Sequence, residues 1–212
     1  RIGDVLFSLH LTVVYFHELF SMWFSTILAS SSPRRKELLT CLGAPFVVRA
    51  PHVDESQTPG ENAESYVRRI ASQKASAING SVVLGADTCV VLEDQIYGKP
   101  ISPRNAGSML RKLSGKVHQV LSGVAVWSDG CLAVEVVETE VEFIQLDQRT
   151  IDWYLSLGES LDKSGAYALQ GAGGTLVKGI RGSHSNVIGL PLVETAGLLK
   201  QAGIDLMSPD QD

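Results

Sequence analysis

The run TILASSSPRRKELLTCLG, residues 26–43, sets a strand directly before a helix and so decides the fold class. Its first four residues, Thr26–Ala29, form a short apolar segment of the kind that makes a buried strand. Ser32 is expected to cap the following helix, because its oxygen can accept from free amides and Pro33 fits the first helical position. Gly43 is expected to end that helix. The chain therefore enters its fold as a strand, a serine-rich turn and a helix.

The same alternation continues along the chain to about residue 202. Further helices are expected over 61–78, 102–113, 147–157 and 191–202. Strands are expected over 46–49, 82–86, 89–92, 95–97, 118–128, 131–144 and 175–180. Two hairpins are expected at Glu93-Asp94 and Asp129-Gly130, and the strand at 82–86 is expected to end at Asp87. This pattern predicts an α/β protein with a mixed central sheet flanked by helices, in two lobes.

The first 25 residues differ from the rest. Residues 5–24 are strongly apolar but contain His10, His17 and Glu18, which a membrane-spanning helix would normally exclude. We expect residues 1–25 to be an extension outside the fold, 26–205 to be the catalytic domain and 206–212 a tail. An interfacial membrane helix in the extension is the alternative, and Met22 is a candidate start of the chain.

Composition narrows the class of protein. The net charge of −5 over 212 residues argues against a general nucleic-acid binder, so a polyanion would need a local basic cluster or a metal. Cys41, Cys89 and Cys131 show no C-x-x-C spacing. They predict buried free thiols in a reducing compartment, hence a cytoplasmic protein without stable membrane association.

Two arginines, Arg34 and Arg35, occupy the first turn of the helix that Ser32 caps. Positive charge there opposes the helix dipole, at a cost of a few tenths of a kcal/mol to about 1 kcal/mol. An anion bound at the helix start would reverse that cost, and the free amides would help to hold it. The residues alone leave an anion site and a solvated basic pair equally open.

Two acidic positions are candidates for metal binding or proton abstraction. Asp87 follows the apolar strand 82–86, and ligands of α/β sheets gather beyond the carboxyl ends of strands. An aspartate that only caps a turn is the alternative. Glu55 lies beside Asp54 in a loop and becomes relevant only if the fold brings it near Asp87, since hard divalent ions take oxygen ligands.

Two lysines each have two interpretations. Lys74 falls on the apolar side of the expected helix 61–78, where it either extends to the solvent at the helix edge or projects into a cleft. Lys99, just after the expected hairpin, has the same alternatives. Other reaction classes lack support, because the sequence has no G-x-x-x-x-G-K-[ST], G-x-S-x-G or H-E-x-x-H motif.

Several short motifs occur in one order along the chain. They are ILASSSPRR at 27–35, LGADT at 84–88, GKP at 98–100, LSG at 113–115 and GLPL at 189–192. In this set and order the chain resembles the Maf proteins over roughly residues 27–203. The resemblance implies an elongated mixed sheet of the Maf and ITPase-like kind, with a cleft between two lobes, and a homodimer.

The resemblance also implies an activity. It is hydrolysis of a nucleoside triphosphate to monophosphate and pyrophosphate with Mg²⁺ or Mn²⁺, which can remove non-standard nucleotides. Asp87 matches the family's proton acceptor, and with Glu55 it is expected to hold the metal ion. The other catalytic positions that match are Arg34, Arg35, Lys74 and Lys99. The alternative is a nucleotide-binding regulator of cell division that needs no turnover.

Three positions relate to which nucleobase the substrate carries. Maf proteins that act on dTTP and UTP resemble this chain in carrying Arg34, Thr88 and Gln170, whereas the group acting on 7-methyl-GTP carries Trp, Gln and Glu there. A glutamine side chain offers one donor and one acceptor group, which suits the imide edge of thymine or uracil. The resemblance therefore implies dTTP and UTP as substrates.

Overall fold

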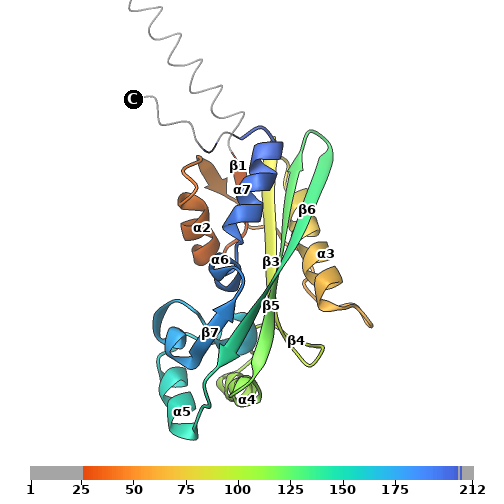
Figure 1. Cartoon of the computed structure of the whole chain (residues 1–212). Coiled ribbons are helices and arrows are strands. Elements are labelled where there is room, and N and C mark those ends of the chain that lie inside the picture. The colour runs from red at the N-terminus through yellow and green to blue at the C-terminus, as the bar shows by residue number, and fades with distance from the viewer. Residues whose placement is uncertain (1–25, 205, 207–212) are drawn as a thin grey trace, which may run out of the picture.

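A computed structural model of the protein describes residues 26–204 and 206 (Figure 1). The expected N-terminal extension lies outside these residues, as do residues 205 and 207–212 of the expected domain end and tail. The strands are β1 Thr26–Ala29, β2 Phe46–Val48, β3 Val82–Leu92, β4 Gln95–Tyr97, β5 Val117–Ser128, β6 Cys131–Phe143 and β7 Val177–Arg181. The α-helices are α2 Pro33–Thr40, α3 Ala63–Ser76, α4 Pro103–Leu113, α5 Gln148–Ser156, α6 His184–Ile188 and α7 Leu192–Gln201, and the 3₁₀ turns are η1 Ser164–Ala166 and η2 Gly171–Leu176.

The strands form one mixed seven-stranded sheet. Its order is β2-β1-β3-β5-β6-β7, and β4 pairs with β3 off this path. β1 is parallel to β2 and β3, whereas every other pairing is antiparallel. The long strands β3, β5 and β6 make the sheet elongated, with helices along both faces (Figure 1). The expected α/β fold with a mixed, helix-flanked sheet is confirmed.

Local side-chain chemistry starts the helices where the sequence predicts. Ser32 Oγ accepts from the Arg35 amide at the start of α2, with Pro33 as the first helical residue. Ser102 and Asp147 cap α4 and α5 in the same way. Helix α6 was not predicted, although Ser183 Oγ accepts from the Asn186 amide at its start. Five residues are too short for a helical period to show in the sequence.

Strand β3 corrects one prediction. It does not end at Asp87 but runs without a break from Val82 to Leu92, and the separate strand expected over 89–92 is its second half. The parallel neighbour β1, in contrast, ends near Asp87, because its last pair with β3 is Ala29 opposite Gly85. On the same edge β4 begins to pair at Val90. Residues 86–89 are therefore without a strand partner on that edge in the described part of the chain.

The core has two main parts at opposite ends of the long strands. One surrounds the first half of β3 and contains β1, α2, α6 and α7 side chains, such as Leu28 and Leu198. The other surrounds the second half of β3 and contains side chains of α4 and α5, such as Leu110 and Tyr154. The gap in strand pairing falls between them. These two parts correspond to the expected lobes.

Helix α3 packs on the opposite face of the sheet from α6 and α7 (Figure 1). Two glycines allow its backbone to come very close. A Cβ atom on Gly85 would lie 2.4 Å from the Ala71 carbonyl oxygen, and one on Gly123 would lie 2.3 Å from the Val67 carbonyl oxygen. Any side chain at either position would push the helix away from the sheet.

Two further details depart from expectation. Only Cys89 is buried, whereas Cys41 and Cys131 are exposed, because Cys41 follows the last turn of α2 and Cys131 begins β6 at a hairpin turn. The strand expected at residue 175 begins at Val177, since residues 171–176 form η2. Among residues 26–204, no helix has the length and hydropathy needed to cross a bilayer.

Candidate active site

A cavity of about 440 Å³ lies where the sheet edge is open, between the two parts of the core. This volume is within the range of small-molecule sites. All eight predicted site residues line it, namely Arg34, Arg35, Glu55, Lys74, Asp87, Thr88, Lys99 and Gln170. The fold thus brings together residues that are up to 136 positions apart in the chain.

The α2 start forms one wall of the cavity. The Ser30-Ser31-Ser32 turn and the first helical turn line it together with both arginines. Arg35 is buried, and its guanidinium donates from Nε to the Gly189 carbonyl oxygen (2.8 Å), from Nη1 to Ser30 Oγ (3.3 Å) and from Nη2 to Thr88 Oγ1 (3.2 Å). Burial lowers the pKa of Arg35, and the negative charges of Asp87 and Glu55 oppose that effect.

Lys74 forms the centre of the facing wall. Its ammonium lies 2.7 Å from Glu55 Oε1 and 2.8 Å from Asp87 Oδ1, and both Lys74 and Asp87 are buried. The lysine therefore projects into the cleft, which decides between its two interpretations. Burial acts to raise the pKa of Glu55, but the Lys74 ammonium, with Lys99 and Arg35, holds it below its usual value. Glu55 is therefore ionised at neutral pH.

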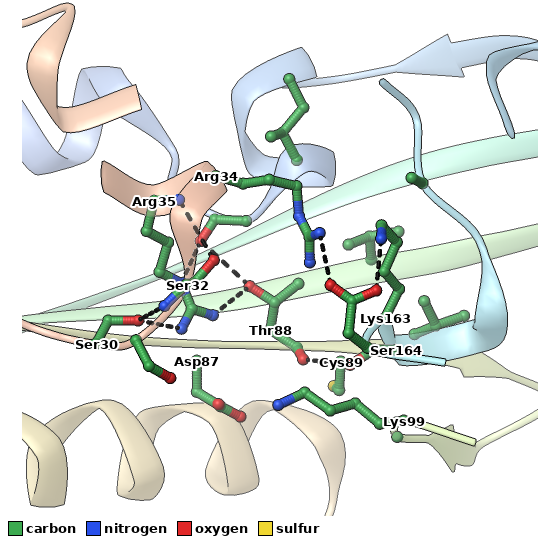
Figure 2. A pocket seen from close by; sticks show the side chains of 18 of the residues that line it. Ser30, Ser32, Arg34, Arg35, Asp87, Thr88, Cys89, Lys99, Lys163 and Ser164 are labelled. Carbon is green, nitrogen blue, oxygen red and sulfur yellow. Dashed lines mark hydrogen bonds and ion pairs between the residues drawn. The ribbon is translucent and has the colours of Figure 1, made fainter. Parts of the chain in front are cut away.

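Glu55 is also held through its backbone. The Tyr66 hydroxyl of α3 donates to the Glu55 carbonyl oxygen at 3.0 Å, so one helix positions the loop at two points. Lys99 comes from the segment after β4 and points towards Asp87 (Figure 2). Its positive charge adds to that of Lys74 on the same side of the cavity.

Thr88 lies beside Asp87 but on the other face of β3. Its hydroxyl accepts from Arg35 Nη2 (Figure 2). It also shares a 2.8 Å hydrogen bond with Ser122 Oγ, and Ser122 is fully buried. The Thr88 hydroxyl is thus engaged by protein groups. Gln170 lines the cavity directly before η2 and is exposed.

Several residues of this cavity were not predicted from the sequence. Asp162, Lys163 and Ser164 line it, as does Tyr66. The Asp-Lys pair before Gly165 was the available signal, because a charged pair that enters a glycine-rich stretch is well placed for a ligand. Ser122, the hydrogen-bond partner of the lining residue Thr88, gave no signal, since a lone serine within an apolar strand has no distinguishing pattern.

The residues present fit a divalent cation that also binds phosphate. Glu55 and Asp87 bring two carboxylates to a single ammonium, which leaves the trio with a net negative charge. The described residues contain no cluster of three or more His, Cys, Asp or Glu side chains able to hold a metal ion by themselves. Mg²⁺ commonly takes one or two carboxylates and completes its shell with substrate phosphates and water. Glu55 and Asp87 suit that arrangement.

The chain is similar in sequence to a known protein family and to several of its members. A family described as Maf-like protein matches residues 25–202. A dTTP/UTP pyrophosphatase of Anaeromyxobacter dehalogenans (strain 2CP-C) is 53% identical over 184 residues, covering 85% of this chain and 95% of that protein. Proteins of the same name from Myxococcus xanthus and Shewanella sp. (strain MR-7) are 48% and 46% identical, over 85% and 84% of this chain and 93% and 98% of theirs.

Among solved structures, the Staphylococcus aureus Ham1 protein aligns with a TM-score of 0.42 at 17% identity, covering 56% of this chain and 71% of that one.

Proposed function

The chain belongs to the Maf family, and we propose that its cleft hydrolyses dTTP and UTP to the nucleoside monophosphate and pyrophosphate. One observation carries the proposal. A buried lysine joins two carboxylates on one wall of a cavity whose opposite wall is an arginine-rich helix start. Such a cavity offers cations for a polyphosphate and an acidic centre for a metal ion and a water molecule.

The N-terminus of α2 is the proposed phosphate-binding site. The free amides of the first turn of α2 and the guanidinium groups of Arg34 and Arg35 all favour negative charge at this place. Arg35 has three hydrogen bonds to protein oxygens and is therefore held in one orientation before substrate arrives. A preorganised cation of this kind stabilises charge that develops on the phosphoryl oxygens and the leaving pyrophosphate.

The acidic centre is the proposed site of water activation. Water attacks the α-phosphorus, the bond from that phosphorus to the bridging oxygen breaks, and pyrophosphate leaves with the electron pair. Asp87 accepts the proton that the water loses, while Lys74 orients the Asp87 carboxylate. Glu55 and Asp87 would hold Mg²⁺ or Mn²⁺, and a bound ion there offsets charge on the phosphate oxygens. Lys99, on the same side of the cavity as Lys74, neutralises charge on the leaving pyrophosphate.

Base preference is assigned to Arg34, Thr88 and Gln170. Gln170 lines the cavity and can present its donor and acceptor to a pyrimidine imide edge. Thr88 contributes through Arg35, because its hydroxyl is already engaged by Arg35 and Ser122. The names of the relatives, dTTP/UTP pyrophosphatase, support the same preference.

A panel of nucleoside triphosphates, scored for monophosphate and pyrophosphate with Mg²⁺ or Mn²⁺, tests the proposal. We expect dTTP and UTP to be the best substrates, and Asp87→Asn to lower kcat by about a hundred- to ten-thousand-fold, the usual contribution of a general base. Asp94→Asn, on the exposed β3–β4 turn, is the matched control. Near wild-type turnover by Asp87→Asn, or a preference for GTP-type bases, would contradict it.

A further inference from the structure

A third set of charges lies at the cavity, apart from the Lys74 and Arg35 groups. Arg34 Nη1 lies 3.3 Å from Asp162 Oδ2, and Lys163 Nζ lies 2.6 Å from Asp162 Oδ1 (Figure 2). One carboxylate thus lies between two cations, and one of these, Arg34, is 128 positions away from it in the chain. All three residues line the cavity.

Exposure separates the members of this group. The side chains of Arg34 and Lys163 are 23% and 13% exposed, whereas that of Asp162 is 61% exposed. The two cations are therefore the more buried members of the group, and the carboxylate lies on the solvent side. An ion pair with so exposed a partner contributes little to stability. A contribution to stability therefore does not explain why Arg34, Asp162 and Lys163 lie together.

The segment that carries Lys163 is anchored at the open edge of β3. Ser164 Oγ donates to the Thr88 carbonyl oxygen at 3.0 Å, and the Gly165 amide donates to the Gly98 carbonyl oxygen at 3.1 Å. A Cβ atom on Gly165 would lie 2.8 Å from Val90 Cγ2, so the segment lies close against the strand. Lys163 is thus held over the cavity by its neighbours, independently of Asp162.

The other cations of the cavity are differently engaged. Lys74 already has two carboxylates, and the Arg35 guanidinium has three neutral acceptors. Arg34 and Lys163 share the single carboxylate of Asp162. Partial burial acts to raise the pKa of Asp162, but Lys163 and then Arg34 outweigh it and hold the pKa below its usual value. Asp162 is therefore an anion at neutral pH and contacts both cations.

We infer that Lys163 is a further phosphate-binding residue of this cleft, and that Asp162 is an internal counter-ion which the phosphates of the ligand displace from Arg34 and Lys163. The inference rests on the proposed function for the identity of the ligand, a nucleoside triphosphate or its pyrophosphate product. A polyphosphate carries more charge than one carboxylate and can bond to both cations at once. Asp162 then swings towards solvent, where most of its surface already lies.

The two residues are expected to have opposite effects on binding. Lys163→Gln removes a charge-assisted hydrogen bond and should weaken binding of inorganic pyrophosphate by roughly tenfold or more, while Lys163→Arg retains most of it. Asp162→Asn removes the competing anion and should tighten binding by about two- to fivefold, the strength of an exposed ion pair. Lys178→Gln, which breaks the Lys178–Glu142 pair outside the cavity, should leave binding unchanged.

Isothermal titration calorimetry of the full chain with pyrophosphate in a Mg²⁺ buffer tests this, with an α,β-imido analogue of dUTP as a second ligand. Thermal melts show whether each variant is folded. Wild-type affinity in a folded Lys163→Gln, or weaker binding in a folded Asp162→Asn, would overturn the inference. If Lys163→Gln does not fold, the sign of the Asp162→Asn effect decides alone. The assay needs no turnover, so absence of dTTP and UTP hydrolysis would remove the proposed function and leave this result standing.

Discussion

At the scale of single residues, burial decides what a charge does. The Lys74 ammonium lies within 2.8 Å of two carboxylates and is shielded from solvent. The free energy of burying this charge therefore depends on both carboxylates. Removing Lys74 would be strongly destabilising, because the buried Asp87 carboxylate would lose its ammonium partner. Helical spacing placed Lys74 on the apolar side of α3, but only the fold supplies Glu55 and Asp87.

Thr88 gives a test at this scale. Thr88→Val keeps the shape but removes the acceptor for Arg35 Nη2 and the partner of Ser122 Oγ. A hydrogen bond to a charged donor is worth about 1.5–3 kcal/mol, so kcat/KM should fall roughly tenfold or more for dTTP and UTP alike. Thr88→Ser should retain activity. Steady-state kinetics with dTTP and UTP check this, and unchanged kcat/KM for both nucleotides in Thr88→Val would contradict a role for this hydrogen bond.

At the scale of elements, the contact of α3 with the sheet sets the site. Gly85 lies two residues before Asp87 in β3, and Ala71 lies one turn before Lys74 in α3. The missing side chain at Gly85 lets the two backbones approach, and this approach brings the Lys74 ammonium to the Asp87 carboxylate. The continuous apolar run at 82–86 predicted the first half of the strand, but the polar pair Asp87-Thr88 at its centre was interpreted as its end.

Gly85→Ala tests the role of this contact. The new Cβ atom would lie 2.4 Å from the Ala71 carbonyl oxygen and 2.6 Å from the Ala75 amide nitrogen, so the helix has to move. Overpacking of this kind costs about 1–3 kcal/mol, and kcat should fall as Lys74 shifts. Chemical denaturation and kinetics measure both effects. Gly179→Ala, in β7 with nothing within 4 Å of the new atom, is the control. Equal effects of the two substitutions would contradict the packing argument.

At the scale of the whole molecule, a buried histidine links the sheet to the segment that follows Lys163. His118 of β5 shares a 2.8 Å hydrogen bond with the Tyr167 hydroxyl, and both rings pack edge-on against Phe143 of β6. Burial lowers the pKa of His118 to about 4, from an ordinary value of 6.5. His118 is therefore neutral in the folded protein at neutral pH.

Stability should therefore depend on pH through His118. Below pH 6.5 the unfolded chain gains a proton at this residue while the folded protein does not, so the free energy of unfolding falls as the pH drops towards about 4. This difference in pKa corresponds to about 3 kcal/mol. His118→Gln can still bond to Tyr167 but does not titrate. Urea unfolding between pH 7 and 4 should show a shallower loss in the variant, and parallel curves would contradict the assignment.

The sequence by itself determined most of the local structure of this protein and eight of the residues that line its cleft. Caps such as Ser32, the hairpin turns and the apolar periods depend on neighbours within a few positions, so they can be read along the chain. Tertiary structure decided the open edge of β3, the burial of Lys74 and the meeting of Arg34 with Asp162 across 128 positions. Those features depend on which distant segments pack together, and no local pattern encodes that distance.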